Sequence, residues 1–199
     1  YSFSGADLII FPCCHPNTIF RVPESVTTIH SNAFQYCSKI EHVIFSSPVT
    51  ICQNAFSFCK ELVEITNSNF IVSVDSFGFY STSITAFDFG ENLSFIGDSA
   101  FTYCHNLLQI GNKQVSHNYP ISIGNRAFFS CLNLGDVYIS DKIQSIGYEA
   151  FGDCFALKTF DFSPQNSIQI IENFTFLHCA GIESISLPST VTTICQYSF

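Results

Sequence analysis

The sequence predicts an α/β repeat fold: a right-handed solenoid with a parallel β ladder, short helical turns and about eight coils of 21–27 residues. Three observations predict it. A phenylalanine recurs at a nearly constant interval, residues of one type keep the same distance from it, and an alternating stretch follows each copy. An interval in the twenties is typical of solenoids in which every repeat is one coil. The recurring residues are Phe11, Phe34, Phe56, Phe77, Phe101, Phe128, Phe151, Phe176 and Phe199.

The segment around each phenylalanine predicts the helical turn. It reads "NAFQYC" at 32–37, "NAFSFC" at 54–59 and "EAFGDC" at 149–154. The alanine before the phenylalanine and the cysteine three residues after it are four residues apart, and this spacing places both on one face of a helical turn. Cysteine is expected to pack there as a small apolar residue. The expected cysteine column consists of Cys14, Cys37, Cys59, Cys104, Cys131, Cys154 and Cys179, with Tyr80 in the remaining coil.

Two short extended segments complete each coil. Nine residues after the phenylalanine, segments such as "VIF" at 43–45 and "VYI" at 137–139 alternate between inward and outward positions, as strands do. A second segment, "VTTI" at 26–29 and 191–194, leads back to the turn. One coil cannot bury its own apolar side, so stability is expected to come from stacking on neighbouring coils. The inward ladder positions are Val43, Ile65, Ile110, Val137, Phe160 and Ile185, and the aliphatic positions before the turn are Ile29, Ile51, Val72, Ile96, Ile123, Ile146, Ile171 and Ile194.

These columns resemble the leucine-rich repeats of the BspA-like (Treponema-type) family, whose repeats run as Ser-Val-Thr-x-Ile-Gly-x-x-Ala-Phe-x-x-Cys-x-x-Leu-x-x-Ile-x-Leu-Pro. The segments "SVTTIHSNAFQYCSKIEHVIF" from residue 25 and "IQSIGYEAFGDCFALKTFDF" from residue 143 are close matches, whereas "SFGFYSTSI" at 76–84 departs from the pattern. The resemblance covers nearly the whole chain. It implies a single leucine-rich-repeat solenoid domain over residues 1–199, expected to be a fragment of a longer array because both ends stop inside coils.

The composition argues against several other functions. A net charge of −9 with only 7 Lys+Arg offers no basic surface for nucleic acid, and no apolar run is long enough to insert into a membrane. No C-x-x-C pair, zinc-finger spacing or catalytic motif is present. We therefore expect no metal, no cofactor and no enzymatic activity.

The cysteines are expected to be reduced. Column residues of successive coils point in parallel, whereas a disulfide needs Cβ atoms that converge. The vicinal pair Cys13 and Cys14 is interpreted as an irregularity near the terminus rather than as a redox site. The cysteines expected to be buried and mostly reduced are Cys37, Cys59, Cys104, Cys131, Cys154 and Cys179.

A protein partner is expected on the outward positions of the strands, which we call the ladder stripe, or on the insertion "GNKQVSHNYP" at 111–120. The candidate partner-binding residues are Arg21, His42, Ile44, Glu64, Asp88, Gln109, Asp136, Tyr138 and Asp161, and the stripe also includes Ile19, Thr66, Thr159, Ser184 and Ser186. Ile44 and Tyr138 are candidate anchors. The alternatives are scattered exposed apolar residues and a tolerated surface loop, both of which are common.

The resemblance implies a non-catalytic protein-binding module of a cell-surface or secreted antigen or adhesin that attaches to host or matrix proteins. An acidic, hydroxyl-rich stripe suits a partner with basic or amide-rich segments. The alternative is an intracellular structural or scaffold protein, cytoplasmic or cytoskeletal, which the many reduced thiols favour. The triplets Asn92-Leu93-Ser94 and Asn173-Phe174-Thr175 fit glycosylation signals of exported proteins, but such triplets also arise by chance.

Overall fold

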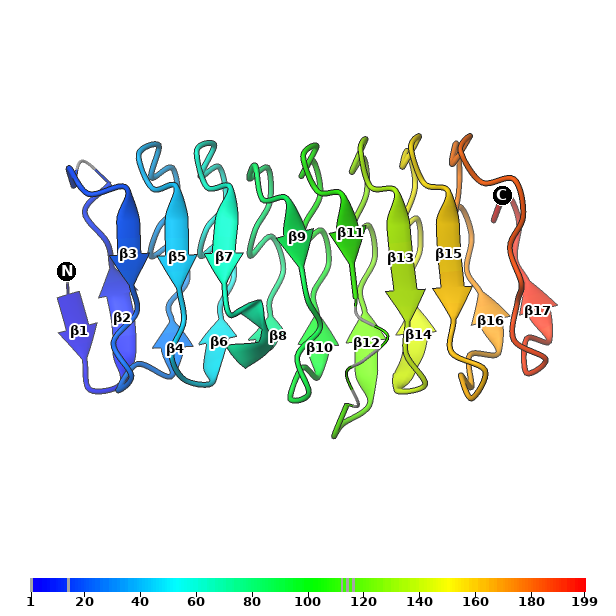
Figure 1. The fold of residues 1–199 in the computed structure, drawn as a ribbon, viewed down its shortest axis with the longest axis horizontal. Helices are drawn as coiled ribbons and strands as arrows, with labels where there is room; N and C mark the ends of the chain where they lie inside the picture. The colour runs from blue at the N-terminus through cyan, green and yellow to red at the C-terminus, as the bar shows by residue number, and fades with distance from the viewer. Residues whose placement is uncertain (1, 14, 112, 114, 116) are drawn as a thin grey trace.

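The chain winds into a stack of coils, and its strands line up in two parallel ladders that run along the molecule (Figure 1). The computed structural model describes residues 2–13, 15–111, 113, 115 and 117–199. We call the ladder nearer the viewer in Figure 1 the front ladder and the other the rear ladder. Inward side chains of both ladders join one apolar core. The predicted solenoid with its parallel ladder and about eight coils is confirmed.

The front ladder is formed by the alternating segments nine residues after the column phenylalanines. Its strands are β3 (Ile19–Arg21), β5 (His42–Ile44) and β7 (Glu64–Thr66), followed by β9 (Ala86–Phe87), β11 (Gln109–Ile110), β13 (Asp136–Ile139) and β15 (Thr159–Phe162). The predicted inward residues Val43, Ile65, Ile110, Val137 and Phe160 are buried in these strands. The prediction is wrong for Ile185, which lies outside the strands and is only half-buried. Ile185 belongs to the last coil, against which only one neighbouring coil packs.

The rear ladder is formed by the segments that lead into the turns. Its parallel strands are β2 (Asp7–Ile10), β4 (Thr28–Ile29), β6 (Val49–Ile51), β8 (Ile71–Val74), β10 (Phe95–Ile96), β12 (Ile121–Ile123) and β14 (Ile143–Ile146), and a separate parallel pair contains β16 (Ile170–Ile171) and β17 (Thr193–Ile194). A further strand, β1 (Ser2–Ser4), pairs antiparallel with β2 across a turn at Gly5, whose φ is +62°.

A continuous column of phenylalanine rings fills the space between the ladders. Phe34 stacks on Phe11 with ring centroids 4.5 Å apart and on Phe56 at 4.6 Å. Phe128 stacks on its neighbours in the same way, at 5.1 Å from Phe101 and 5.3 Å from Phe151. The predicted stacking is confirmed for these rings. Offset stacking of aromatic rings adds about 0.5–1.5 kcal/mol per pair to the burial of their surface.

The prediction is wrong for Phe77, because Phe79 occupies the column in that coil. The Phe79 ring lies 5.1 Å from Phe56 and 5.3 Å from Phe101 and is fully buried, whereas Phe77 is partly exposed. Gly78 precedes Phe79 as the small residue, and Thr82, not Tyr80, takes the cysteine position.

The register of the rear ladder shifts with this correction. Val74, not Val72, is the buried residue that pairs with Ile51 and Ile96. With Phe79 in the column, the interval from Phe56 is 23 residues, so the rear-ladder segment keeps its usual length in this coil. The irregularity lies after the turn instead, where Ile84 follows Phe79 by five residues rather than the usual six.

The turns are held by bonds between coils rather than by helical bonds. The residues two before and two after the column phenylalanine have positive φ, for example 63° at Asn32 and 61° at Tyr36, although left-handed backbone costs a bulky residue about 1–2 kcal/mol. This conformation directs alternate N–H groups to the next coil, and Phe34 N–H donates to Ala55 O over 2.7 Å. The turns therefore contain little helix. Among the described residues the one helical element is the 3-10 helix η1 (Ser68–Phe70).

Replacing Phe128 by Ala should lower the free energy of unfolding by about 3–5 kcal/mol, because it empties a buried site between two stacked rings. The exposed Phe155, with half of its surface accessible, provides the matched control, and Phe155→Ala should cost less than about 1 kcal/mol. Urea unfolding measures both values. Hydrogen exchange of Phe128→Ala should accelerate first in the coils of Phe101 and Phe151, and uniform acceleration along the chain would contradict nearest-neighbour stacking.

Candidate functional site

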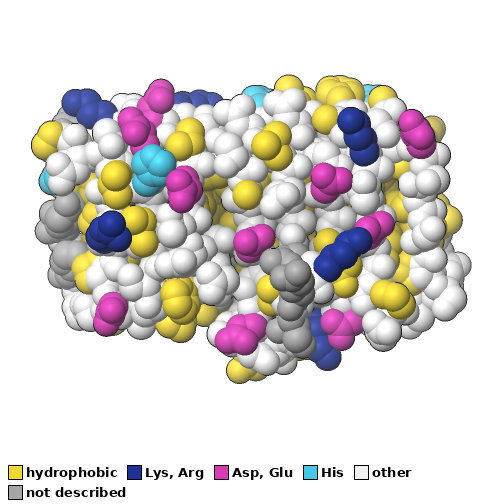
Figure 2. Space-filling model, viewed as in Figure 1, with side chains coloured by type: hydrophobic (Ala, Val, Ile, Leu, Met, Phe, Trp, Pro, Cys, Tyr) yellow, Lys and Arg dark blue, Asp and Glu magenta, His cyan; other side chains and the backbone are white. Residues whose placement is uncertain are grey.

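The ladder stripe is the outward side of the front ladder, and Figure 2 shows this face. Strand register aligns its side chains in rows: His42 lies between Ile19 and Glu64, and Ile44 lies between Arg21 and Thr66. In the second half of the ladder, Asp136 pairs with Gln109 and Thr159, and Tyr138 pairs with Asp161. Asp88 directly follows β9. The structure thus brings the predicted site residues to one face, where each is at least partly exposed.

The stripe is interrupted between β7 and β9. The strands before and after this point belong to separate sheets. In the first part, His42 Nδ1 lies 3.2 Å from Glu64 Oε2, so these neighbouring strands are joined by a polar contact at the surface. Ser184 and Ser186 are exposed but lie outside the strands.

A shallow groove of about 570 Å³ opens on the second part of the stripe. Lys113 reaches into it: its Nζ lies 2.5 Å from Asp161 Oδ2 and 5.7 Å from the centre of the Tyr138 ring. The hydrogen bond to Asp161 raises the pKa of Lys113, so this ammonium group is charged at neutral pH. The lining residues are Asp88, Gln109, Ile110, Gly111, Lys113, Asp136, Val137, Tyr138, Thr159 and Asp161.

At Gly111, on the lining of the groove, the backbone passes close to the neighbouring strand. The φ of Gly111 is +76°, and a Cβ atom there would lie 2.4 Å from the carbonyl oxygen of Tyr138. Only glycine fits such a close approach without displacing the neighbouring strand. The chain leaves the ladder at this residue and enters the predicted insertion at 111–120.

The insertion is only partly within the described residues, since 112, 114 and 116 lie outside them. Its C-terminal part is anchored: His117 is buried, with 3% of its surface exposed, and Asn118 N–H donates to Glu91 O over 2.8 Å. Burial lowers the pKa of His117, partly opposed by the Phe89 backbone and by Asp141. Burial of His117 and the backbone bond from Asn118 therefore tie this end of the insertion to the coil that contains Glu91.

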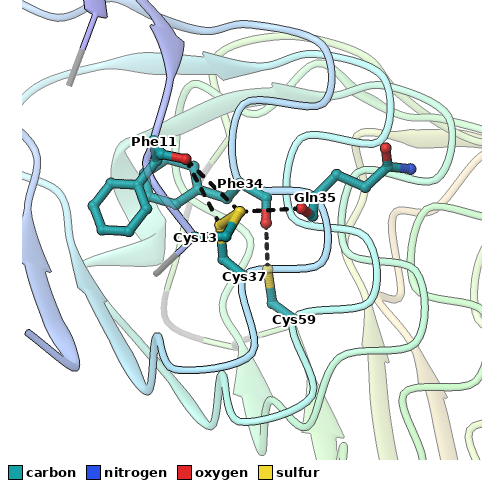
Figure 3. The surroundings of a disulfide bond; sticks show 6 residues. All are labelled: Phe11, Cys13, Phe34, Gln35, Cys37 and Cys59. Carbon is teal, nitrogen blue, oxygen red and sulfur yellow. Dashed lines mark hydrogen bonds between the residues drawn. A yellow bond between two sulfur atoms is a disulfide. The ribbon is translucent and has the colours of Figure 1, made fainter. Parts of the chain in front are cut away.

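The cysteine column connects successive coils through thiol hydrogen bonds. Each thiol donates to the carbonyl oxygen of the column phenylalanine one coil earlier, as Cys59 does to Phe34 over 2.9 Å (Figure 3). The sequence did indicate buried cysteines, but it gave no sign of these bonds. The other sulfur–oxygen distances are 3.1 Å for Cys104 and Phe79, 3.3 Å for Cys131 and Phe101, 3.3 Å for Cys154 and Phe128, and 3.1 Å for Cys179 and Phe151.

Burial keeps these thiols protonated. It raises the pKa of Cys59 and Cys179 to about 12 and that of Cys104 to about 11, and it also raises the pKa of Cys131 and Cys154. The thiolate, not the thiol, is the nucleophile and the metal ligand. These cysteines are therefore suited to packing and hydrogen bonding rather than to chemistry.

The prediction of a reduced thiol is wrong for Cys37, which forms a disulfide with Cys13 (Figure 3). Cys13 lies two residues after Phe11 rather than three, in the turn that contains Pro12, and this offset brings its Cα within 4.2 Å of the Cys37 Cα. Cys14, the expected column residue of this coil, lies outside the described residues. Cys59, Cys104, Cys131, Cys154 and Cys179 are free thiols, as predicted.

No metal centre is formed in the part of the chain that the structure describes, where no three His, Cys, Asp or Glu side chains are grouped to hold an ion. Described histidines instead contact single carboxylates at the surface. His30 Nε2 lies 3.3 Å from Asp7 Oδ2, and His178 Nδ1 lies 2.7 Å from Asp153 Oδ1.

Sequence reasoning missed a second surface feature, which we call the turn-edge aromatic row. Tyr36 stacks on Phe58 at 4.9 Å, and the contacts continue from coil to coil along the turns. Arg126 joins two segments of the row, with its guanidinium 5.6 Å from Phe129 and 5.8 Å from Tyr148. The available signal was an aromatic residue one or two positions after the column phenylalanine in the first five members, and two or three positions before it in the last three. The row consists of Tyr36, Phe58, Tyr80, Tyr103, Phe129, Tyr148, Phe174 and Tyr197.

Comparison with known proteins agrees with this architecture. A family model described as BspA type leucine rich repeat region matches residues 9–108 and 112–199, in 6 copies. No curated protein matches the sequence.

Solved structures are similar to the chain, and the first two described here share its fold. The leucine-rich repeat protein of Treponema pallidum is 21% identical, with 84% of this chain and 78% of that chain covered and a TM-score of 0.68. The pneumococcal vaccine antigen PcpA is 14% identical, with 97% of this chain and 40% of that chain covered and a TM-score of 0.55. A leucine-rich cell surface protein of Faecalibacterium prausnitzii is 21% identical, with 92% of this chain and 70% of that chain covered and a TM-score of 0.43.

The column thiols should make the protein sensitive to alkali. Because their pKa is above the usual 9.0 in the folded state, the unfolded chain releases protons that the folded chain retains as pH rises above 9. The free energy of unfolding should then fall by about 1.4 kcal/mol per pH unit for each thiol, up to the folded-state pKa.

Urea unfolding between pH 7 and pH 10.5 measures this dependence. Cys59→Ala should make the fall in the free energy of unfolding above pH 9 less steep, by the contribution of one thiol, about 1.4 kcal/mol per pH unit. Cys59→Thr, which copies the natural Thr82 of the same column, should reduce it equally while retaining a hydroxyl donor. Equal slopes for wild type and both variants would contradict the assignment of buried, protonated thiols.

Proposed function

Because the chain belongs to the BspA-type leucine-rich repeat family, we propose that it is a non-catalytic protein-binding module of a cell-surface antigen or adhesin that attaches to host or matrix proteins. The observation that carries the proposal is the ladder stripe. Its side chains stand in register on a rigid sheet, and such extended faces are the usual binding surfaces of solenoids.

Two side chains on the stripe are suited to anchor a partner. Ile44 and Tyr138 are apolar residues in the same outward row as Arg21 and Asp161, and each is partly exposed beside polar neighbours. They lie four ladder steps apart, which is about 19 Å, within the width of a standard protein interface. Aromatic and aliphatic anchors surrounded by polar groups are typical of binding hot spots.

The remaining reactive side chains support a non-catalytic role. The buried column thiols donate to backbone carbonyl groups, and the surface histidines His30, His42 and His178 each contact one carboxylate. The groove on the stripe is open and shallow, a shape that suits contact with a macromolecule.

Two observations favour a cell-surface or secreted location. The disulfide between Cys13 and Cys37 is typical of oxidising compartments, and PcpA, which shares the fold, is described as a vaccine antigen. The free thiols favoured an intracellular scaffold, but thiols that are buried and protonated also survive outside the cell. No helix in the described residues has the length and apolar character needed to cross a membrane.

The double variant Ile44→Ser and Tyr138→Ser should weaken attachment to a host-surface or matrix protein by more than about tenfold, because both anchors are lost while the core is untouched. Biolayer interferometry against a panel of such proteins measures this at equal folded fraction. The control is Tyr36→Ser with Tyr103→Ser, which removes two members of the turn-edge aromatic row.

Loss of binding in the control variant alone would move the binding site to the turn edge. If no extracellular protein binds wild type, and a cytoplasmic partner is recovered from native extracts instead, the intracellular scaffold is favoured.

A further inference from the structure

The groove on the front ladder is already occupied by a cation from the same chain. Lys113 Nζ contacts Asp161 at 2.5 Å and lies above the Tyr138 ring at 5.7 Å, although the lysine itself is solvent-exposed. An ammonium group beside a carboxylate and over an aromatic face gains from both contacts. The groove therefore has the shape and polarity to hold a positively charged side chain.

The groove has more negative charge than Lys113 neutralises. Three carboxylates line it, from Asp88, Asp136 and Asp161, against the single ammonium group. The whole chain carries a net charge of −9, and acidic side chains recur along this face (Figure 2). An approaching acidic segment or nucleic acid would be repelled, whereas a basic segment would be attracted.

We infer that this groove binds an extended segment of a partner protein through two basic side chains, and that Lys113 occupies the place of one of them in the free protein. The inference rests on the proposed function, because it identifies the kind of partner that the ladder stripe fits. The groove is an open part of an unpartnered sheet face, and charge complementarity selects its occupant.

The spacing of the carboxylates indicates how the basic residues of the partner are arranged. Asp88, Gly111, Tyr138 and Asp161 follow one another in a single row of the ladder. Asp88 and Asp161 are three ladder steps apart, which is about 14 Å, and an extended chain covers this distance in about four residues. The partner segment should therefore carry basic residues at positions i and i+4.

Arginine fits the groove better than lysine. Its planar guanidinium can lie flat on the Tyr138 ring and still donate two hydrogen bonds to the carboxylate of Asp161. Gly111, which precedes Tyr138 in this row, has no side chain that could cover the ring, and a Cβ there would lie 2.4 Å from the Tyr138 carbonyl oxygen.

The probe is the acetylated and amidated peptide Gly-Arg-Ser-Thr-Ser-Arg-Gly, titrated into the isotope-labelled protein at 20 mM salt and followed by NMR chemical shifts. Shifts should concentrate at Gly111, Tyr138 and Asp161. The same peptide with glutamine in place of both arginines should bind at least about fivefold more weakly, as should the arginine peptide at 300 mM salt, since exposed ion pairs are screened.

Two variants should change the affinity in opposite directions. Asp88→Asn with Asp161→Asn should weaken binding about five- to tenfold, the value expected for two ion pairs at the surface, and Lys113→Gln should strengthen it about two- to fivefold by removing the internal competitor. The matched controls are Glu24→Gln with Glu61→Gln and Lys142→Gln, which change the net charge equally at exposed or partly exposed positions outside the groove. The controls should shift the affinity less than twofold, a general charge effect.

Weaker or unchanged binding in Lys113→Gln would overturn the inference, as would equal effects of the aspartate variant and its control, or no shifts at the groove with any peptide. The outcome is separable from that of the proposed function. Suppose that a matrix protein loses affinity for the Ile44→Ser and Tyr138→Ser variant but binds the aspartate variant normally. The ladder stripe would then remain the binding face, and the inference that the partner binds through a basic segment would be rejected.

Discussion

The carbonyl group of each column phenylalanine is the point on which the stack of coils depends. The oxygen of Phe34 accepts the N–H of Cys37 within its own turn and the thiol of Cys59 from the next coil. The same residue places its ring between those of Phe11 and Phe56. Because the same residue provides both the carbonyl acceptor and the stacked ring, the motif keeps a phenylalanine and a small hydrogen-bond donor three residues later. The bonds between coils also explain why the turn contains left-handed residues, which a helix would exclude.

Departures from the repeat create the surface on which we place function. The longest interval, between Phe101 and Phe128, contains the insertion that leaves the ladder at Gly111. The chain passes close to Tyr138 at Gly111, and Lys113 then lies over the Tyr138 ring in the groove. Most apolar side chains of the repeats are buried between coils. A partner protein would therefore contact the outward polar groups and a few apolar anchors.

The columns in the sequence predicted the fold because each coil packs residues of the same type at the same positions against its neighbours. They failed where two candidates lay close together: Phe77 and Phe79 are both compatible with the interval, and only stacking selects Phe79. The disulfide of Cys13 with Cys37 depends on the local path of the first turn, which spacing does not reveal. The residues of the ladder stripe could be predicted from the alternation of inward and outward positions along the strands. The groove could not be predicted, because it depends on the path of the insertion.

A double-mutant cycle between neighbouring rings of the column tests the central claim most directly. Phe101→Leu and Phe128→Leu remove two rings whose centroids are 5.1 Å apart, and their effects on the free energy of unfolding should be coupled by about 0.5–1.5 kcal/mol. The same cycle with Phe34 and Phe151, which are not neighbours, should give a coupling below about 0.5 kcal/mol. Equal coupling in both cycles, or none between Phe101 and Phe128, would contradict a stack that is held together from coil to coil.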